Sequence, residues 1–259
     1  IGSSTVGWQP GVLRGQDFVR CGRGLRLDLN GDNRVEDIDA LCGANAPKDA
    51  LFIDENGQPA EDPTDRVIAD PNPRWTGGLN TSLRLGKLRL SGLLDTRQGQ
   101  EVWNGTKGIL YNFGTHKDTE VRTQQGVFGR GGTVMTDEQV AGPGVGKVAF
   151  SNLRQWQGWF NGNGGGFGPV SRQFVEDGSF VKLREVSAAY TLDGAWVRSR
   201  LGFSSVDFRL AGRNLAMWTD YTGFDPEANL GGSEFFTQGL DYFNNPQARS
   251  FVLSLTLNR

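Results

Sequence analysis

The chain has 259 residues, of which 38 are glycine, 22% are charged and 10% are aromatic, and its formal net charge is −2. The glycines follow no G-X-Y period, which excludes collagen, and seven tryptophans with sixteen phenylalanines argue against a disordered chain. Near-neutral charge gives no electrostatic attraction for nucleic acid, and no apolar run approaches the roughly 18 residues of a membrane-spanning helix. A chain rich in glycine and aromatic residues and poor in helical periodicity is expected to be all-β.

The amino-terminal region gives two expectations. Ile1 is not an initiator methionine and no charged-then-apolar signal segment follows it, so we expect the chain to begin after processing or inside a longer polypeptide. The only two cysteines, Cys21 and Cys42, flank a loop-like sequence. They can form a disulfide or stay as two free thiols. The segment between them resembles a calcium-binding loop, as described next, and this favours a bridge in an extracytoplasmic protein.

Oxygen-bearing side chains recur between the cysteines at the spacing of a calcium loop. Side-chain oxygens stand at loop positions 1, 3, 5, 9 and 12, which are Asp28, Asn30, Asp32, Glu36 and Asp39. Position 7, Arg34, offers its backbone carbonyl. Because calcium takes about six to eight oxygen ligands, this spacing predicts a Ca2+ site. Gly31 stands at position 4 rather than 6, so we expect Asn33 to make the sharp turn. The alternative is an Asx-rich surface turn.

A degenerate copy of this loop covers residues 54–65. Asp54, Asn56 and Asp65 hold positions 1, 3 and 12, but the middle positions carry Gln58 and Ala60. The pattern favours a loop of similar shape over a second calcium site.

Apolar and polar residues alternate with period two in several stretches, as strands with one apolar face require. Residues 79–85 and 88–95 predict a hairpin with a two-residue turn at Gly86-Lys87, and Leu93 is the one exception to its alternation. Residues 179–192 predict a long strand, and a bulge near Arg184-Glu185 would restore its phase. Residues 204–216 and 251–257 predict two more strands, and 119–128 and 147–160 two weaker ones.

The connections between these strands are alternately short and long. Gly86-Lys87 and residues 193–203 are short, whereas 98–118, 161–178 and 217–246 are long, polar and rich in glycine, asparagine and aromatics. This is the pattern of an antiparallel transmembrane β-barrel of the outer membrane. A soluble β-sandwich also alternates and is the alternative. In a barrel, Trp218, Tyr221 and Trp196 are expected at the membrane interfaces.

Motifs for catalysis are weak. The single histidine, His116, lies in a polar stretch with no cysteine nucleophile nearby, and the chain has no G-x-S-x-G elbow and no His/Cys metal spacing. We therefore expect no enzyme activity and no catalytic residues.

Four segments resemble the SusC/RagA-type TonB-dependent outer-membrane transporters. Residues 174–192 are similar to the family strand VEDGSFVRLR…SLGYTL, and residues 211–227 to its GxNLxxWTDYTGxDPE segment. Residues 65–78 resemble DRxxIGDPNPxWTGG, and residues 239–247 resemble the approach to the last strand. The order of these segments along the chain matches the family order.

The resemblance implies the carboxy-terminal part of a 22-stranded barrel, roughly its last third, with long extracellular loops. Residues 1–73 would form an early strand and loop region with the cysteine-bracketed loop, and residues 74–259 the last barrel strands. It implies import of glycan or peptide fragments across the cell outer membrane. The implied partners are a SusD-like surface lipoprotein, outer-membrane lipid and, through an upstream region, TonB.

Two features depart from the family pattern. The loop before the Asp-Pro-Asn-Pro motif, residues 54–65, is an eroded form of the family's acidic loop, and Arg259 stands where such chains usually carry an aromatic residue. A different class of function also fits the residues: a secreted, calcium-stabilised β-sandwich module that binds carbohydrate through its loop tryptophans.

Overall fold

The computed structural model describes residues 2–3, 5–29, 31–42, 46, 48–53, 59–120, 127–128, 134–135, 144–145, 160–162, 165–232 and 237–259. The chain forms two compact units. The loop unit comprises Ile1–Asn72, Glu101–Glu176 and Asn229–Asn244, and the sheet unit Pro73–Gln100, Asp177–Ala228 and Asn245–Arg259. The first division falls beside the expected boundary at residue 73, and two later segments between strands also fold with the amino-terminal region.

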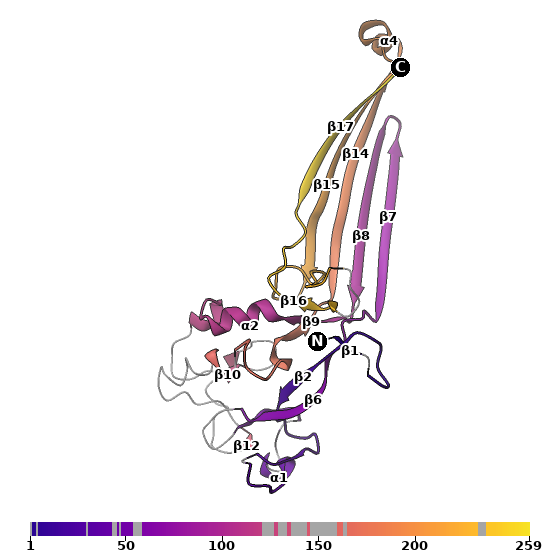
Figure 1. Ribbon diagram of the computed structural model, residues 1–259. Helices are drawn as coiled ribbons and strands as arrows, with labels where there is room; N and C mark the ends of the chain where they lie inside the picture. The colour runs from indigo at the N-terminus through magenta and orange to yellow at the C-terminus, as the bar shows by residue number, and fades with distance from the viewer. Residues whose placement is uncertain are drawn as a thin grey trace. The chain divides into compact units, whose positions relative to one another are not determined.

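The sheet unit is built on one antiparallel sheet of five long strands (Figure 1). Their order across the sheet is β17-β15-β14-β8-β7, so strands that follow one another along the unit also pair. The strands are β7 (Trp75–Leu85), β8 (Leu88–Gln98), β14 (Phe180–Asp193), β15 (Ser205–Thr219) and β17 (Ser250–Asn258). The predicted hairpin is confirmed, because Gly86 adopts φ +61° in the two-residue turn between β7 and β8.

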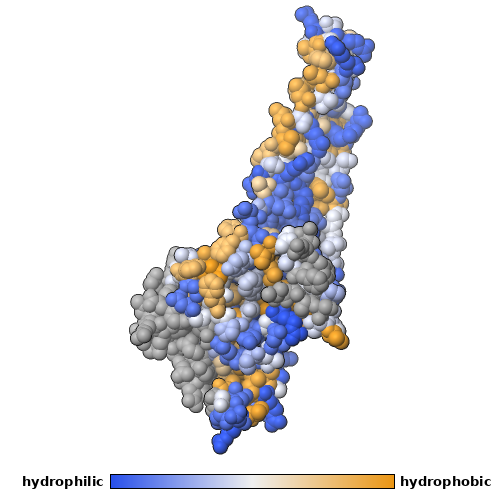
Figure 2. All heavy atoms as spheres, in the orientation of Figure 1, coloured by the Kyte–Doolittle hydropathy of each residue, from blue (hydrophilic) through white to orange (hydrophobic). Residues whose placement is uncertain are grey.

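Side chains alternate between an apolar and a mainly polar face of this sheet, with Leu93 as an exception on the polar side. One cross-strand row runs through Leu83, Leu90, Ala188, Leu210 and Leu253, and the adjacent row on the other face through Ser82, Ser91, Ser187, Ala211 and Val252. On the apolar face, Leu83 is 54% exposed and Leu253 is 76% exposed. Figure 2 shows hydrophobic residues along this sheet. A contiguous exposed apolar surface of this kind marks contact with lipid or another apolar partner.

The predicted bulge in β14 is also confirmed. The register of β14 shifts between Leu183 and Glu185 against both β8 and β15. In the facing stretch of β15, Asn214 adopts a left-handed φ of 51°. Arg184 then bonds to Asp95, while Glu185 bonds to Arg209. The bulge thus turns two consecutive charged side chains to the polar face, which a regular strand cannot do.

The loop unit contains short strands and helices. Its largest sheet joins β2 (Val12–Phe18) to β6 (Glu61–Ala69) and β1 (Gly2–Ser3). The shorter strands are β3 (Arg26–Leu27), β4 (Glu36–Asp37), β5 (Phe52–Ile53), β9 (Glu101–Asn104), β10 (Val127–Phe128), β11 (Val134–Met135), β12 (Gly144–Val145), β13 (Val175–Asp177) and β16 (Leu240–Asp241). The helices are α1 (Ile38–Cys42), α2 (Gly105–Asn112), η1 (Lys117–Glu120) and η3 (Arg172–Phe174).

Two helices lie where the sequence predicts only connections. α2 occupies the expected long loop 98–118, and its N-cap is Asn104, whose side chain accepts from the Lys107 backbone N–H. α4 (Ala195–Leu201) occupies the expected short connection between β14 and β15. No helix among the described residues is long and apolar enough to cross a membrane.

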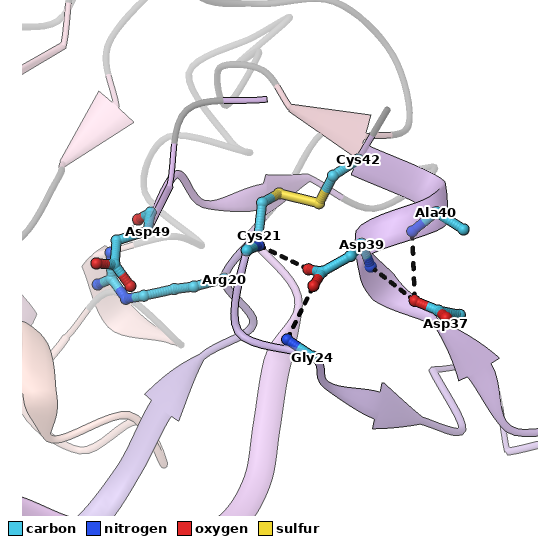
Figure 3. Close-up of a disulfide and its surroundings, with 9 residues drawn as sticks. Arg20, Cys21, Gly24, Asp37, Asp39, Ala40, Cys42 and Asp49 are labelled. Carbon is cyan, nitrogen blue, oxygen red and sulfur yellow. Dashed lines mark hydrogen bonds between the residues drawn. A yellow bond between two sulfur atoms is a disulfide. The ribbon is translucent and has the colours of Figure 1, made fainter. Parts of the chain in front are cut away.

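The structure joins Cys21 and Cys42 in a disulfide, with 5.9 Å between their Cα atoms. Cys21 is fully buried in a small core with Val19, Ile38 and Phe52. Asp39 lies beside the bridge and accepts hydrogen bonds from the backbone N–H groups of Gly22 and Gly24 (Figure 3). The bridge therefore closes a loop that has only a few buried side chains of its own.

Replacing both cysteines with serine is expected to destabilise this region by about 3 kcal/mol, because the closed loop no longer restricts the unfolded chain. Hydrogen exchange of the peptides covering residues 12–42 measures the effect. Reduction of the unaltered protein should reproduce it, whereas reductant should leave the double-serine variant unchanged. Equal protection in the oxidised protein and the double variant would contradict the expectation.

Candidate functional site on the polar face of the sheet

The polar face of the sheet unit is the candidate functional site. It contains a concavity of about 490 Å3, lined among others by the hydroxyls of Ser82, Ser91 and Ser187 and the guanidinium groups of Arg89 and Arg209. The Ser91 and Ser187 hydroxyl oxygens are 2.7 Å apart and share a hydrogen bond. These groups can form hydrogen bonds with a polar solute, and the arginines can pair with an anionic one.

A buried ion network lies at the end of this face near the bulge. The Lys182 ammonium is 2.6 Å from an Asp225 oxygen and 2.5 Å from a Glu227 oxygen. Arg184 reaches Glu227 at 2.7 Å and Asp95 at 2.6 Å. The side chains of Lys182, Asp225 and Glu227 are each less than 10% exposed. Charges this deeply buried persist only when they are paired, and here each has at least one partner of opposite sign.

The two halves of the network come from different kinds of structure. Lys182 and Arg184 stand on β14, one on either side of Leu183, whereas Asp225 and Glu227 belong to the irregular segment that follows β15. Asp225 shapes this segment, because its carboxylate accepts from the Glu227 N–H and its carbonyl accepts from the Ala228 N–H. The network therefore ties a connecting segment to the polar face of β14.

The environment of Glu227 changes its acidity. Burial raises the pKa of this carboxyl group, but hydrogen bonds from Arg184 and Lys182 outweigh burial and hold the pKa at about 2, against an ordinary value of 4.5. Glu227 is therefore ionised at every pH at which the protein is expected to work, and the network keeps its charge pairs.

A second carboxylate pairs with arginines closer to the concavity. Glu185 accepts from Arg209 at 2.8 Å and from Arg213 at 3.1 Å. The side chains of both arginines are more than half exposed, so solvent weakens these pairs. Arg89 also lines the concavity. Among the described residues, no carboxylate pairs with Arg89. The concavity is thus richer in positive than in negative charge.

The loop unit has a buried polar cluster of its own. Lys107 of α2 pairs with Glu176 at 3.0 Å, and both side chains are about 5% exposed. The Thr106 hydroxyl lies 3.4 Å from Asp241 and accepts the Phe243 N–H. This cluster connects α2 with two segments that are far away in the sequence, and it is a structural rather than a reactive site.

Several aromatic side chains of the loop unit pack on one another. Tyr111 makes edge contacts with Phe160 and Phe174, at centroid distances of 5.5 and 5.7 Å. Trp103 and Tyr242 are stacked at 6.4 Å beside an apolar pocket of about 320 Å3. Of the aromatics expected at membrane interfaces, Trp218 and Trp196 are exposed, but Tyr221 is only 5% exposed. The expected interfacial position is wrong for Tyr221, because the segment that follows β15 folds back onto the sheet and the Tyr221 side chain is buried.

The predicted calcium loop forms a compact turn. The Asp28 carboxylate accepts the backbone N–H groups of Gly31, Asp32 and Asn33, and Asp32 accepts that of Arg34. Asn33 adopts φ 65°, which confirms that it makes the sharp turn.

Two of the predicted ligands make other contacts in the part of the loop that the structure describes. Glu36 accepts the Leu29 N–H, and Asp39 faces Gly22 and Gly24. Among the described residues no three His, Cys, Asp or Glu side chains are grouped to hold a metal ion, and Asn30 lies outside these residues. Calcium binding stays a prediction. In the degenerate loop, Asp54, Asn56 and Gln58 also lie outside the described residues.

The residues of the buried network were not predicted as a site. Lys182 and Arg184 had a usable signal, since both fall on the polar phase of a strand whose bulge is visible in the sequence. Asp225 and Glu227 end the segment that resembles the family motif, residues 211–227, but no local pattern shows that this irregular segment folds back onto β14. Pairing of charges that are 43 to 45 positions apart is a tertiary property.

Comparisons with known proteins give a consistent picture. No family model matches the chain. The chain is 27% identical over 232 residues to TonB-dependent receptor P3 of Formosa agariphila, a match that covers 88% of this chain and 20% of that protein. TonB-dependent receptor P26 of the same organism is also 27% identical, with 86% and 21% covered. The chain thus spans about a fifth of the length of these relatives.

Among solved structures, the RagAB peptide transporter aligns with 95% of this chain and 22% of its own chain. The TM-score is 0.50 and the sequence identity 14%, so the likeness concerns the fold alone.

Replacing Glu227 with glutamine is expected to lower the free energy of unfolding by roughly 3 kcal/mol at pH 7, because Lys182 loses one of its partners. In the unaltered protein the contribution of Glu227 is present above pH 4.5 and is lost as the pH falls toward about 2. Denaturant unfolding in detergent micelles between pH 7 and pH 2 measures both effects. Glu185→Gln, at a solvated pair, is the matched control and should cost less than about 1 kcal/mol. Equal losses in the two variants would contradict the role of the network.

Titration calorimetry with Ca2+ tests the loop at residues 28–39. If the spacing prediction is right, the chain binds calcium and Asp28→Ala and Asp32→Ala both abolish the heat of binding. Asp65→Ala, in the degenerate loop, is the control and should leave it unchanged. An unaltered isotherm for Asp28→Ala would remove the loop from any calcium site.

Proposed function

Because the chain belongs to the SusC/RagA type of TonB-dependent outer-membrane transporters, we propose that its sheet unit is a section of the wall of a transmembrane β-barrel. The observation that carries this proposal is the face segregation of the five strands. Leu83, Leu210 and Leu253 are each more than half exposed on one face, and charged and hydroxyl side chains predominate on the other. An outer-membrane barrel has this division, with an apolar outer band and a polar interior.

The dimensions of the strands support the same assignment. They contain 9 to 15 residues, and a tilted strand of about 9–11 residues crosses the hydrocarbon core. The connections at one end of the sheet are a two-residue turn and the segment with α4, whereas the strands are joined at the other end through long segments. In such barrels the short turns face the periplasm and the long loops the cell exterior.

We propose that the whole protein imports oligomeric nutrients, glycan or peptide fragments, and that the polar face lines its interior. A SusD-like surface lipoprotein would deliver the cargo, and TonB would act through a region outside this chain. The relatives named TonB-dependent receptors support the dependence on TonB. The serine hydroxyls and arginines of the concavity suit a polar cargo, and passage along them requires no bond breaking. On this proposal the protein is a transporter and not an enzyme.

The alternative, a secreted β-sandwich that binds carbohydrate, fits the sheet less well. In a sandwich a second sheet buries the apolar face. Leu253 and Phe251 of β17 are instead 76% and 71% exposed in the structure.

The variants Leu253→Arg and Val252→Arg test the barrel assignment, because they introduce the same charge at adjacent positions on opposite faces. In the full-length polypeptide folded into lipid vesicles, Leu253→Arg should cost about 2–4 kcal/mol if the residue lies near the bilayer midplane. Val252→Arg faces the interior and should cost much less. Urea unfolding and the electrophoretic shift between folded and unfolded barrel measure the difference. Equal costs, or folding without any lipid or detergent, would contradict the assignment and favour the soluble module.

A further inference from the structure

The short helix α4 presents an unusual combination of exposed side chains at the turn end of the sheet unit (Figure 1). Val197 is 3% exposed and anchors the helix, while Trp196 is 62% and Leu201 is 47% exposed. Arg198 and Arg200 are exposed as well. Two large apolar groups and two arginines therefore share a single two-turn helix.

The turn end also has an excess of positive charge. Arg84 precedes the β7–β8 turn, and Lys87, in this turn, pairs with Asp193, two residues before α4. Asp207, a second side-chain carboxylate at this end, accepts from the side chains of Thr191 and Asn258. Arg84 donates to the Gly86 carbonyl. Within the described residues no carboxylate pairs with Arg84, Arg198 or Arg200.

The apolar face of the sheet leads directly to α4. The last cross-strand row but one before the helix joins Tyr190, Phe208 and Leu255, which are 41–57% exposed. Two of these three side chains are aromatic, and Trp196 follows six residues after Tyr190. Aromatic side chains prefer the boundary between hydrocarbon and headgroups, which places α4 at headgroup depth if the apolar face contacts acyl chains.

We propose that α4, together with the adjoining β7–β8 turn, binds the phosphate groups of anionic phospholipids in the periplasmic leaflet. This inference rests on the proposed barrel function. Arg198 and Arg200 pair with phosphate oxygens, and Trp196 and Leu201 enter the interface between headgroups and acyl chains. The surface complements such a lipid in both respects, since it continues an apolar face and carries uncompensated positive charge. A basic residue near an anionic membrane surface contributes about 1 kcal/mol, or roughly a fivefold increase in local lipid association.

Quenching of Trp196 by brominated lipids tests the proposal in the full-length polypeptide. The protein is folded into phosphatidylcholine vesicles that contain equal small fractions of either brominated phosphatidylglycerol or brominated phosphatidylcholine. Subtracting the signal of Trp196→Phe isolates this one tryptophan from all others in the polypeptide, six of which lie in this chain. We expect quenching by the brominated phosphatidylglycerol to exceed that by the brominated phosphatidylcholine at least fivefold, and the ratio to fall in high salt.

In Arg198→Gln/Arg200→Gln the quenching ratio is expected to fall toward one. Arg26→Gln/Lys48→Gln removes the same charge from exposed sites in the loop unit and should keep the ratio of the unaltered protein.

Three outcomes would overturn the proposal. Equal quenching by both lipids would show an interface without anionic selectivity. Absence of quenching by either lipid would show that another polypeptide segment or protein covers α4. A ratio unchanged in Arg198→Gln/Arg200→Gln would show that these arginines do not carry the selectivity. If the protein does not fold into vesicles at all, the result contradicts the proposed barrel function and not the lipid-binding proposal. Failure of the barrel proposal and failure of the lipid proposal are therefore distinguishable.

Discussion

The register of β14 against its two neighbours is the constraint on which the sheet unit depends. Because side chains alternate along each strand, a slip of one residue would move every leucine of the apolar face to the polar face. The bulge between Leu183 and Glu185 and the left-handed Asn214 in β15 secure this register. They also allow Arg184 and Glu185 to face the same side. The apolar surface and the ion network are therefore two consequences of one pattern of hydrogen bonds.

The buried network adds specificity at a cost in desolvation. Lys182, Asp225 and Glu227 leave water together, and their mutual attraction must offset that cost. A hydrophobic cluster could tie down the same segment, but it would place apolar groups on the face assigned to polar cargo. Arg184 joins the network to Asp95 on β8, so one set of charges couples two strands to the segment that follows a third.

Two further regions stabilise the molecule by other means. In the loop unit the disulfide and the small core around Cys21 hold a segment with little apolar surface of its own, while the Lys107–Glu176 pair anchors α2. At the turn end of the sheet, Val197 fixes α4 and leaves its arginines and Trp196 outside. The loop unit, whose core is small, is thus held by a covalent bond. The turn end of the sheet exposes cationic and aromatic groups where an anionic interface is expected.

The sequence by itself determined the long strands, the Gly86 turn, the β14 bulge and the division of the sheet into an apolar and a polar face. These features arise from local alternation and backbone preference, which short stretches of residues encode completely. Only the tertiary structure decided that the segment after β15 folds inward, that Tyr221 is buried, and that Asp225 and Glu227 pair with Lys182. It also showed α2 and α4, whose short sequences carry too few apolar positions for a helical period. Those features depend on contacts between residues tens of positions apart, and such contacts leave no periodic signal in the chain.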